Sequence, residues 1–182
     1  MLQDMAMKVD VSLCLLVIPI VLSLLLSSHH FAKADNEIGK PLITATCSQT
    51  EFPDVCISTL ESDPRSSSAN LTGLSRIGLE LAITKADEIK ADAYTLIFNA
   101  TSYHNWDIRS SCFGAYNLSF YPFNESLQYF DELKYNESYR IVDTFNKGLH
   151  YCIDVGVTEL AAGITFLTKF TTDVKAILHL LF

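Results

Sequence analysis

The sequence lacks the short motifs that mark the common hydrolase, metalloprotease and nucleotide-binding sites. It contains no Gly-x-Ser-x-Gly elbow, no His-Glu-x-x-His helix, no Gly-x-x-x-x-Gly-Lys loop and no Gly-x-Gly-x-x-Gly turn. Beyond the N-terminal segment, the bases that work near neutral pH are His104, His150 and His179, and each stands alone in the sequence. We therefore predict that the chain has no catalytic residues, needs no cofactor and is not an enzyme.

Positive charge is scarce. The chain has 13 lysines and arginines against 21 aspartates and glutamates, which gives a net charge of −8. An acidic protein repels phosphate backbones, so nucleic acid is not an expected partner. The sequence also has no Cys-x-x-Cys pair, which makes a zinc site the weaker interpretation of its cysteines, and we expect no metal.

The apolar run near the N-terminus is short for a membrane-spanning helix. It extends over 16 residues from Val11 to Leu26 and is interrupted by Pro19, whereas a span needs roughly 20 apolar residues. The small-x-small sequence Ala32-Lys33-Ala34 follows it, as in a secretory signal peptide. We expect residues 1–34 to be removed and residues 35–182 to form one secreted domain with no membrane anchor.

Cysteines are few, but their number fits an oxidising compartment. Cys14 lies in the expected signal peptide, and Cys47, Cys56, Cys112 and Cys152 remain. An even number of cysteines in a secreted domain predicts two disulfides, although spacing alone allows three connectivities. We prefer Cys47 with Cys56 and Cys112 with Cys152, because the first pair is close enough to staple a helical hairpin.

The sequence is rich in acceptor sites for N-linked glycans. Sequons of the form Asn-x-Ser/Thr without a central proline mark exposed positions in a secreted protein. Their number suggests that only some are occupied. The candidate glycosylation sites are Asn70, Asn99, Asn117, Asn124 and Asn136.

Helical periodicity dominates the chain after residue 70. Apolar residues recur every three or four positions over residues 70–100, and again over residues 106–130, where Pro122 interrupts the pattern. A proline inside a helix costs about 3 kcal/mol or more. We therefore expect the second helix to be bent or broken near Phe120–Phe123. The turn-forming stretch 62–68 separates these helices from the first cysteine pair.

A third helix is predicted over residues 139–149. Asn136 or Ser138 can cap its N-terminus, and Asn146–Gly148 is typical of a helix end. The following residues, 155–166, fit either another helical piece or a loop.

The last helix is predicted over residues 167–181, with Thr171 or Thr172 as its N-cap and Asp173 near its positive end. No segment alternates apolar and polar residues as a half-buried strand does. The predicted fold class is therefore all-α: a helix bundle over about residues 70–182, preceded by a helical hairpin over about residues 36–62.

The cysteine spacing and its flanking residues resemble the plant invertase and pectin methylesterase inhibitor family. Within residues 42–86, two cysteines are separated by eight residues, an aromatic-Pro pair precedes the second, and Leu-Glu-Ser-Asp-Pro-Arg-Ser follows. The likeness continues with Cys112 followed by Tyr116, with Cys152-Ile153-Asp154, and with an apolar C-terminal helix. It covers nearly all of residues 35–182.

The resemblance implies an antiparallel four-helix bundle behind the hairpin, with the disulfide pairing preferred above. It also implies a secreted inhibitor located in the cell wall, or in the vacuole. Such an inhibitor docks on either an acid invertase or a pectin methylesterase and blocks the active site of that enzyme. An esterase inhibitor is expected to use a helical face rather than one loop. The alternative is a non-inhibitory wall glycoprotein or small-ligand carrier on the same bundle.

One loop is a candidate inhibitory element by resemblance. Some invertase-inhibiting members present Pro-Lys-Phe between the second and third bundle helices, and the similar place here holds Leu133-Lys134-Tyr135. The ammonium of Lys134 would meet acidic groups of a glycosidase site while the ring of Tyr135 packs against its wall. The other interpretation is a solvated Lys134 and a Tyr135 that covers the bundle end. A glycan on the neighbouring Asn136 would obstruct docking through this loop.

Overall fold

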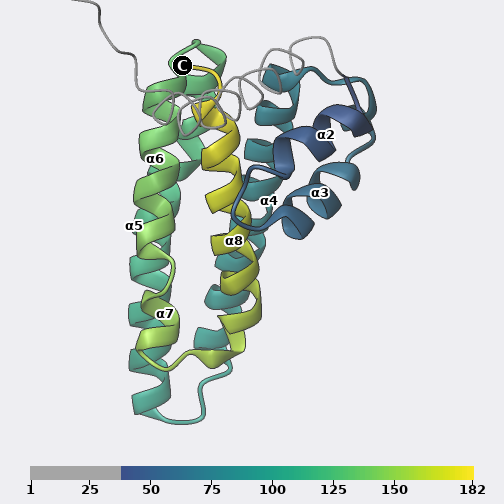
Figure 1. Ribbon diagram of the computed structural model, residues 1–182. Coiled ribbons are helices and arrows are strands. Elements are labelled where there is room, and N and C mark those ends of the chain that lie inside the picture. The colour runs from purple at the N-terminus through teal and green to yellow at the C-terminus, as the bar shows by residue number, and fades with distance from the viewer. Residues whose placement is uncertain (1–37) are drawn as a thin grey trace, which may run out of the picture. The chain divides into compact units, whose positions relative to one another are not determined.

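The computed structural model describes residues 38–182, and the expected signal peptide, residues 1–34, lies outside them. Every regular element in the described part is helical (Figure 1). In chain order the elements are α2 (Lys40–Cys47), α3 (Pro53–Glu61), the 3-10 turn η2 (Pro64–Ser68), α4 (Leu71–Phe98), α5 (Tyr103–Asp131), α6 (Tyr135–Gly148), α7 (Tyr151–Asp154), η3 (Thr158–Leu160) and α8 (Ala161–His179).

Four long helices form the bundle. Figure 1 shows α4, α5, α6 and α8 running side by side, and α4 and α6 each pack on both α5 and α8, which closes the ring. Aromatic rings fill its centre: Phe123 stacks on Phe145 with ring centroids 4.0 Å apart, and the Tyr116 hydroxyl donates to the Ala86 carbonyl at 3.0 Å. Burial of apolar area is the main force that holds such a bundle together.

The helical hairpin α2–α3 packs on α8 and α4 of the bundle. Its inner side chains, among them Leu42, Ile43 and Leu60, are fully or almost fully buried. The predicted all-α fold, a four-helix bundle behind a hairpin, is therefore confirmed.

Two disulfides join the helices. Cys47 bonds to Cys56 and closes the hairpin, and Cys112 bonds to Cys152 and ties α5 to α7. All four cysteines are buried. This is the connectivity that the spacing favoured over the two alternatives.

Pro122 does not break its helix. α5 is one continuous element, so of the two predicted outcomes near Phe120–Phe123, a bend or a break, the break is wrong. Pro122 faces solvent, while Phe120 and Phe123 on either side of it are buried against the bundle. The missing N–H removes one backbone hydrogen bond on the outer side, and the buried aromatic stripe holds both halves of the helix in register.

Two predicted N-caps are also wrong. α6 begins at Tyr135, so Ser138 lies inside the helix, where it is buried. α8 begins at Ala161, so Thr171 and Asp173 lie mid-helix rather than at its start. The open question over residues 155–166 resolves into a turn, η3 and the first turns of α8. The predicted end of the third helix at Asn146–Gly148 is confirmed.

Candidate functional site

The turn between α5 and α6 contains the candidate inhibitory loop. Leu133 adopts φ 62°, a left-handed conformation, and 72% of it is exposed. The Leu133 nitrogen donates to the Phe130 carbonyl and the Lys134 nitrogen to the Tyr129 carbonyl, both at 2.9 Å. These two bonds are the helix-ending Schellman arrangement, in which glycine is the usual left-handed residue. The turn is therefore well defined, with a leucine side chain at its tip.

The two candidate loop residues point to different surroundings. The Lys134 ammonium lies at the surface, 2.7 Å from a Glu132 carboxylate oxygen and 5.7 Å from the Tyr129 ring centre. The hydrogen bond to Glu132 raises the pKa of Lys134, and the same bond lowers the pKa of Glu132. The ring of Tyr135 packs on Phe130 at 5.0 Å. Lys134 is thus available to a partner, whereas Tyr135 covers the end of the bundle.

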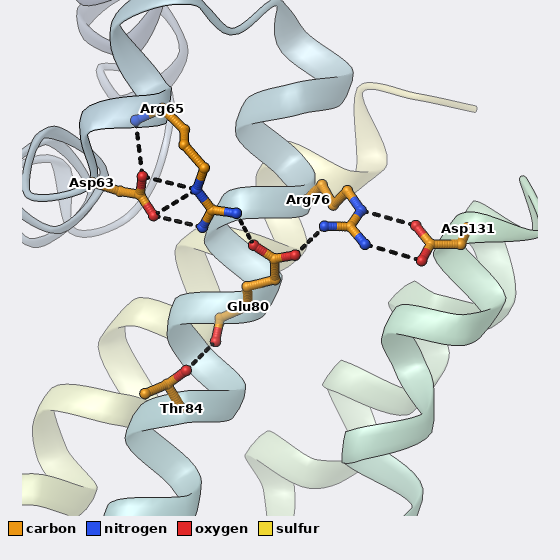
Figure 2. Close-up of polar contacts among 6 residues, drawn as sticks. All are labelled: Asp63, Arg65, Arg76, Glu80, Thr84 and Asp131. Carbon is orange, nitrogen blue, oxygen red and sulfur yellow. Dashed lines mark hydrogen bonds and ion pairs between the residues drawn. The ribbon is translucent and has the colours of Figure 1, made fainter.

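A chain of ion pairs supports this end of the molecule (Figure 2). Asp63 is the N-cap of η2 and accepts hydrogen bonds from the backbone and guanidinium of Arg65. Arg65 in turn pairs with Glu80 of α4 at 2.6 Å. Glu80 also pairs with Arg76 one turn before it. Acidic and basic side chains alternate along this network, so each one contacts neighbours of opposite charge.

The last link of this chain joins two bundle helices. The Arg76 guanidinium donates two hydrogen bonds, of 2.9 and 3.1 Å, to the carboxylate of Asp131, the final residue of α5. This contact lowers the pKa of Asp131 and raises that of Arg76. Planar two-point contacts of this kind fix geometry better than a single ammonium does. The network therefore connects the hairpin linker, α4 and the base of the α5–α6 turn.

Only part of this network can be read from the sequence. Arg76 and Glu80 are four residues apart on one predicted helix, and Asp63 and Arg65 belong to the quoted Ser-Asp-Pro-Arg turn. Asp131 lies 55 residues from Arg76, and no local pattern predicts that pairing.

A groove lies between α5 and α6. Its volume is about 400 Å³, and its floor includes the stacked ring of Phe145. Leu118 is 77% exposed on its rim. The lining is mixed apolar and polar: Leu118, Ser119, Pro122, Glu137, Arg140, Ile141, Thr144 and Phe145. From the sequence, Pro122 is interpreted only as a helix breaker. No sequence pattern predicts the groove, because the groove depends on how two helices pack.

The three isolated histidines lie at separate places in the fold. His104 is in the first turn of α5, His150 precedes α7 and His179 ends α8, and all three are exposed. Within residues 38–182 no three metal-binding side chains come together.

The sequons occupy three kinds of position. Asn70 caps α4 by accepting from the Gly73 nitrogen at 2.9 Å, and Asn136 lies in the first turn of α6. Asn117 and Asn124 are inside α5, and Asn99 is the residue that ends α4. Their occupancy stays a prediction.

Residues 41–154 match the family model described as plant invertase/pectin methylesterase inhibitor. The chain belongs to this family. The match includes the hairpin, the ion-pair network, both disulfides and the α5–α6 turn, whereas η3 and α8 lie beyond it.

Two curated relatives are inhibitors rather than enzymes. A pectinesterase inhibitor of Actinidia deliciosa is 36% identical over 76 residues, which are 42% of this chain and 39% of the relative. Pectinesterase inhibitor 28 of Oryza sativa subsp. japonica is 44% identical over 45 residues, 25% of this chain and 20% of the relative. The matched stretches thus span less than half the length of either relative.

Solved structures support the fold. A crystal structure of a pectin methylesterase inhibitor from Arabidopsis thaliana matches with a TM-score of 0.58 at 15% identity, covering 76% of this chain and 95% of that one. A mutant form A of a pectin methylesterase inhibitor from Arabidopsis gives the same TM-score at 17% identity, with 74% and 91% covered. Family and fold together support an inhibitory role.

Among the described residues, the helices fall short of the length and apolar character that crossing a bilayer requires.

Proposed function

We propose that this chain is a secreted, cell-wall inhibitor of pectin methylesterase that docks through the α5–α6 surface and blocks the active site of the enzyme. The α5–α6 surface is the groove between these two helices, rimmed by Leu118 and Pro122. The observation that carries the proposal is the groove, whose rim holds Leu118, a large apolar side chain that is 77% exposed. Both curated relatives bear the name pectinesterase inhibitor.

The composition of the groove suits a protein partner. Leu118 and Ile141 offer apolar contact, while Glu137 and Arg140 at the edge offer charges of both signs. An apolar centre with a polar rim is the usual anatomy of a protein–protein interface. The rigid helices on both sides need little reordering on binding, which favours affinity.

Docking through the loop alone is less well supported. Tyr135 packs on Phe130 and is not available as a plug, and the Lys134 ammonium must leave Glu132 before it can bind elsewhere. An acid invertase remains the second candidate target, since Lys134 is exposed at the tip of the turn.

The test is inhibition by the full chain secreted from plant cells, with its disulfides, measured against a pectin methylesterase and an acid invertase at mildly acidic pH. We expect inhibition of the esterase. The variant Leu118→Asp should weaken it about 30-fold or more, because a buried interface centre is typically worth about 2 kcal/mol. The matched control is Thr95→Asp, which places the same charge on an exposed position of α4.

Three outcomes would replace the proposal. Inhibition of invertase alone, lost in Lys134→Ala but not in Leu118→Asp, would assign the loop and the other target. Loss in Thr95→Asp equal to that in Leu118→Asp would remove the α5–α6 surface. A folded chain that inhibits neither enzyme but binds fatty acids or sterols at equilibrium would favour the carrier.

A further inference from the structure

Exposed aromatic side chains gather around the turn that joins α4 to α5. Phe98 is 70% exposed and Tyr103 is 79% exposed, although such rings are normally buried. The five rings, called here the turn aromatic patch, are Tyr94, Phe98, Tyr103, Trp106 and Phe113. They are far from the α5–α6 turn in sequence and take no part in the proposed inhibitory surface.

The rings contact one another on both sides of the turn. Tyr94 lies between Phe98 and Phe113, with ring centroids 5.0 and 5.3 Å away. On α5, Tyr103 stacks on Trp106 at 5.9 Å with an angle of 27° between the ring planes. Most of these rings keep a face or edge open to solvent. Exposed rings that lie together rather than singly are candidates for contact with another group.

The chain contains a candidate for that group at the centre of the patch. Asn99 follows Phe98 directly, ends α4 and is exposed, and it starts the sequon Asn99-Ala100-Thr101. A sugar attached there would follow Phe98 directly and precede Tyr103 by four residues in the sequence. No other described sequon is a helix-ending residue: Asn70 and Asn136 are at helix N-termini, and Asn117 and Asn124 are inside α5.

The chemistry of the patch fits an uncharged saccharide. A sugar ring presents a face of polarised C–H groups, which stacks on the electron-rich face of an aromatic ring, while its hydroxyls stay hydrated. Asp92 and Asp107 lie within two residues of Tyr94 and Trp106 in the sequence and are exposed.

We propose that Asn99 carries an N-linked glycan whose first sugars cover the turn aromatic patch. The donor is an oligosaccharide joined to a lipid diphosphate in the secretory pathway. The bond between its anomeric carbon and the phosphate oxygen breaks, a bond from that carbon to Nδ2 of Asn99 forms, Nδ2 loses one proton and the lipid diphosphate leaves. Nothing is oxidised or reduced. The glycan thereby converts an apolar patch into a hydrated surface.

The experiment uses the full chain secreted from plant cells. The inference rests on the secretion that the proposed function includes, but enzyme inhibition is not a readout, so a chain that inhibits no enzyme would leave it intact. Glycopeptides are mapped by mass spectrometry, and binding of a hydrophobic fluorescent dye is measured before and after enzymatic removal of the glycans. We expect Asn99 to be occupied and dye fluorescence to rise on deglycosylation. Thr101→Ala should lose one glycan and show the same rise, whereas Thr101→Ser, which keeps the sequon, should show neither.

A second variant separates the patch from a general loss of folding. In a chain that combines Thr101→Ala with Tyr103→Ser and Trp106→Ser, the rise in fluorescence should be strongly reduced, with an unchanged helical spectrum. An unmodified Asn99 in secreted protein would overturn the proposal, as would fluorescence that is the same with and without the glycan. A dimer held by the bare patch would assign it to a second copy of the chain and would also overturn it.

Discussion

Asp173 of α8 accepts a hydrogen bond from the backbone nitrogen of Phe52, at 2.9 Å, and so fastens the hairpin turn to the bundle. Its carboxyl group is fully buried, and its second oxygen, Oδ2, has no partner among the described residues. Burial raises the pKa of Asp173 from 3.8 to about 6, and the Glu51 carboxylate adds to this effect. A carboxylate in such a place is costly when ionised.

The raised pKa of Asp173 predicts that acid stabilises the hairpin attachment. Between pH 3.8 and about 6 the folded chain holds a proton at this site that the unfolded chain has lost. The free energy of unfolding should therefore fall as pH rises through this window, by about 2–3 kcal/mol from this group. Denaturant unfolding of the wild type and Asp173→Asn at both ends of the window measures the difference.

Asp173→Asn keeps an acceptor for the Phe52 nitrogen and cannot ionise. The variant should lack the fall in unfolding free energy that Asp173 causes between pH 3.8 and about 6. Near neutral pH its unfolding free energy should exceed that of the wild type. Equal pH profiles for the two proteins would contradict this account.

The ion-pair network predicts a modest stability loss in Arg76→Met. The variant removes both hydrogen bonds to Asp131 and the contact with Glu80, and because these groups are partly exposed the expected cost is about 1 kcal/mol. Chemical denaturation measures it. Lys85→Met, which breaks an exposed pair with Glu88 on the same helix, is the matched control and should cost less.

The pH dependence of this pair has the opposite sign to that of Asp173. Arg76 lowers the pKa of Asp131, so the contribution is present above the usual aspartate pKa of 3.8 and is lost as pH falls through the lowered value. A loss in Arg76→Met that does not shrink in strong acid would argue against this electrostatic origin.

The turn at Leu133 predicts a stabilising substitution. Its left-handed backbone is disfavoured for a leucine by about 1 kcal/mol relative to glycine. Leu133→Gly should therefore raise the free energy of unfolding, by up to about that amount. Leu133→Ala, which keeps a Cβ, serves as the control, and a Gly variant no more stable than the Ala variant would show that the turn is unstrained.

The two disulfides should differ in their contribution to stability. In the chain-entropy model the closure across nine positions, Cys47 to Cys56, contributes about 2.5 kcal/mol, and the closure across 40 positions, Cys112 to Cys152, about 4 kcal/mol. Paired serine variants compared by denaturant unfolding test the order. A greater loss of stability on removing the Cys47–Cys56 disulfide would mean that native contacts, rather than chain entropy, determine the contribution of each disulfide.

Local patterns predict the long helices well because α4 and α5 keep an apolar stripe over many turns and begin at Asn70 and Ser102, which cap them. The same reasoning fails where burial overrides local preference. Thr171 resembles an N-cap, yet it lies buried mid-helix and donates to the Leu167 carbonyl one turn before it. Pro122 resembles a break, yet its ring faces solvent on a helix held by buried aromatics.

The candidate site was predictable only in part for a related reason. The turn at Lys134 is continuous in sequence and is found by resemblance. The groove, in contrast, is lined by residues of two helices, such as Leu118 of α5 and Ile141 of α6. The burial of Asp173 under Phe52 depends in the same way on residues 121 positions apart. Contacts of this kind arise from packing and have no local sequence pattern.

The most direct measurement of the central claim is a titration of a fixed amount of pectin methylesterase with the purified, secreted chain, followed by residual activity. The account predicts that activity falls to a low plateau at about one inhibitor per enzyme, and that Leu118→Asp shifts the curve to much higher concentration while Thr95→Asp leaves it in place. Full esterase activity in excess of a helical, disulfide-bonded chain would contradict it.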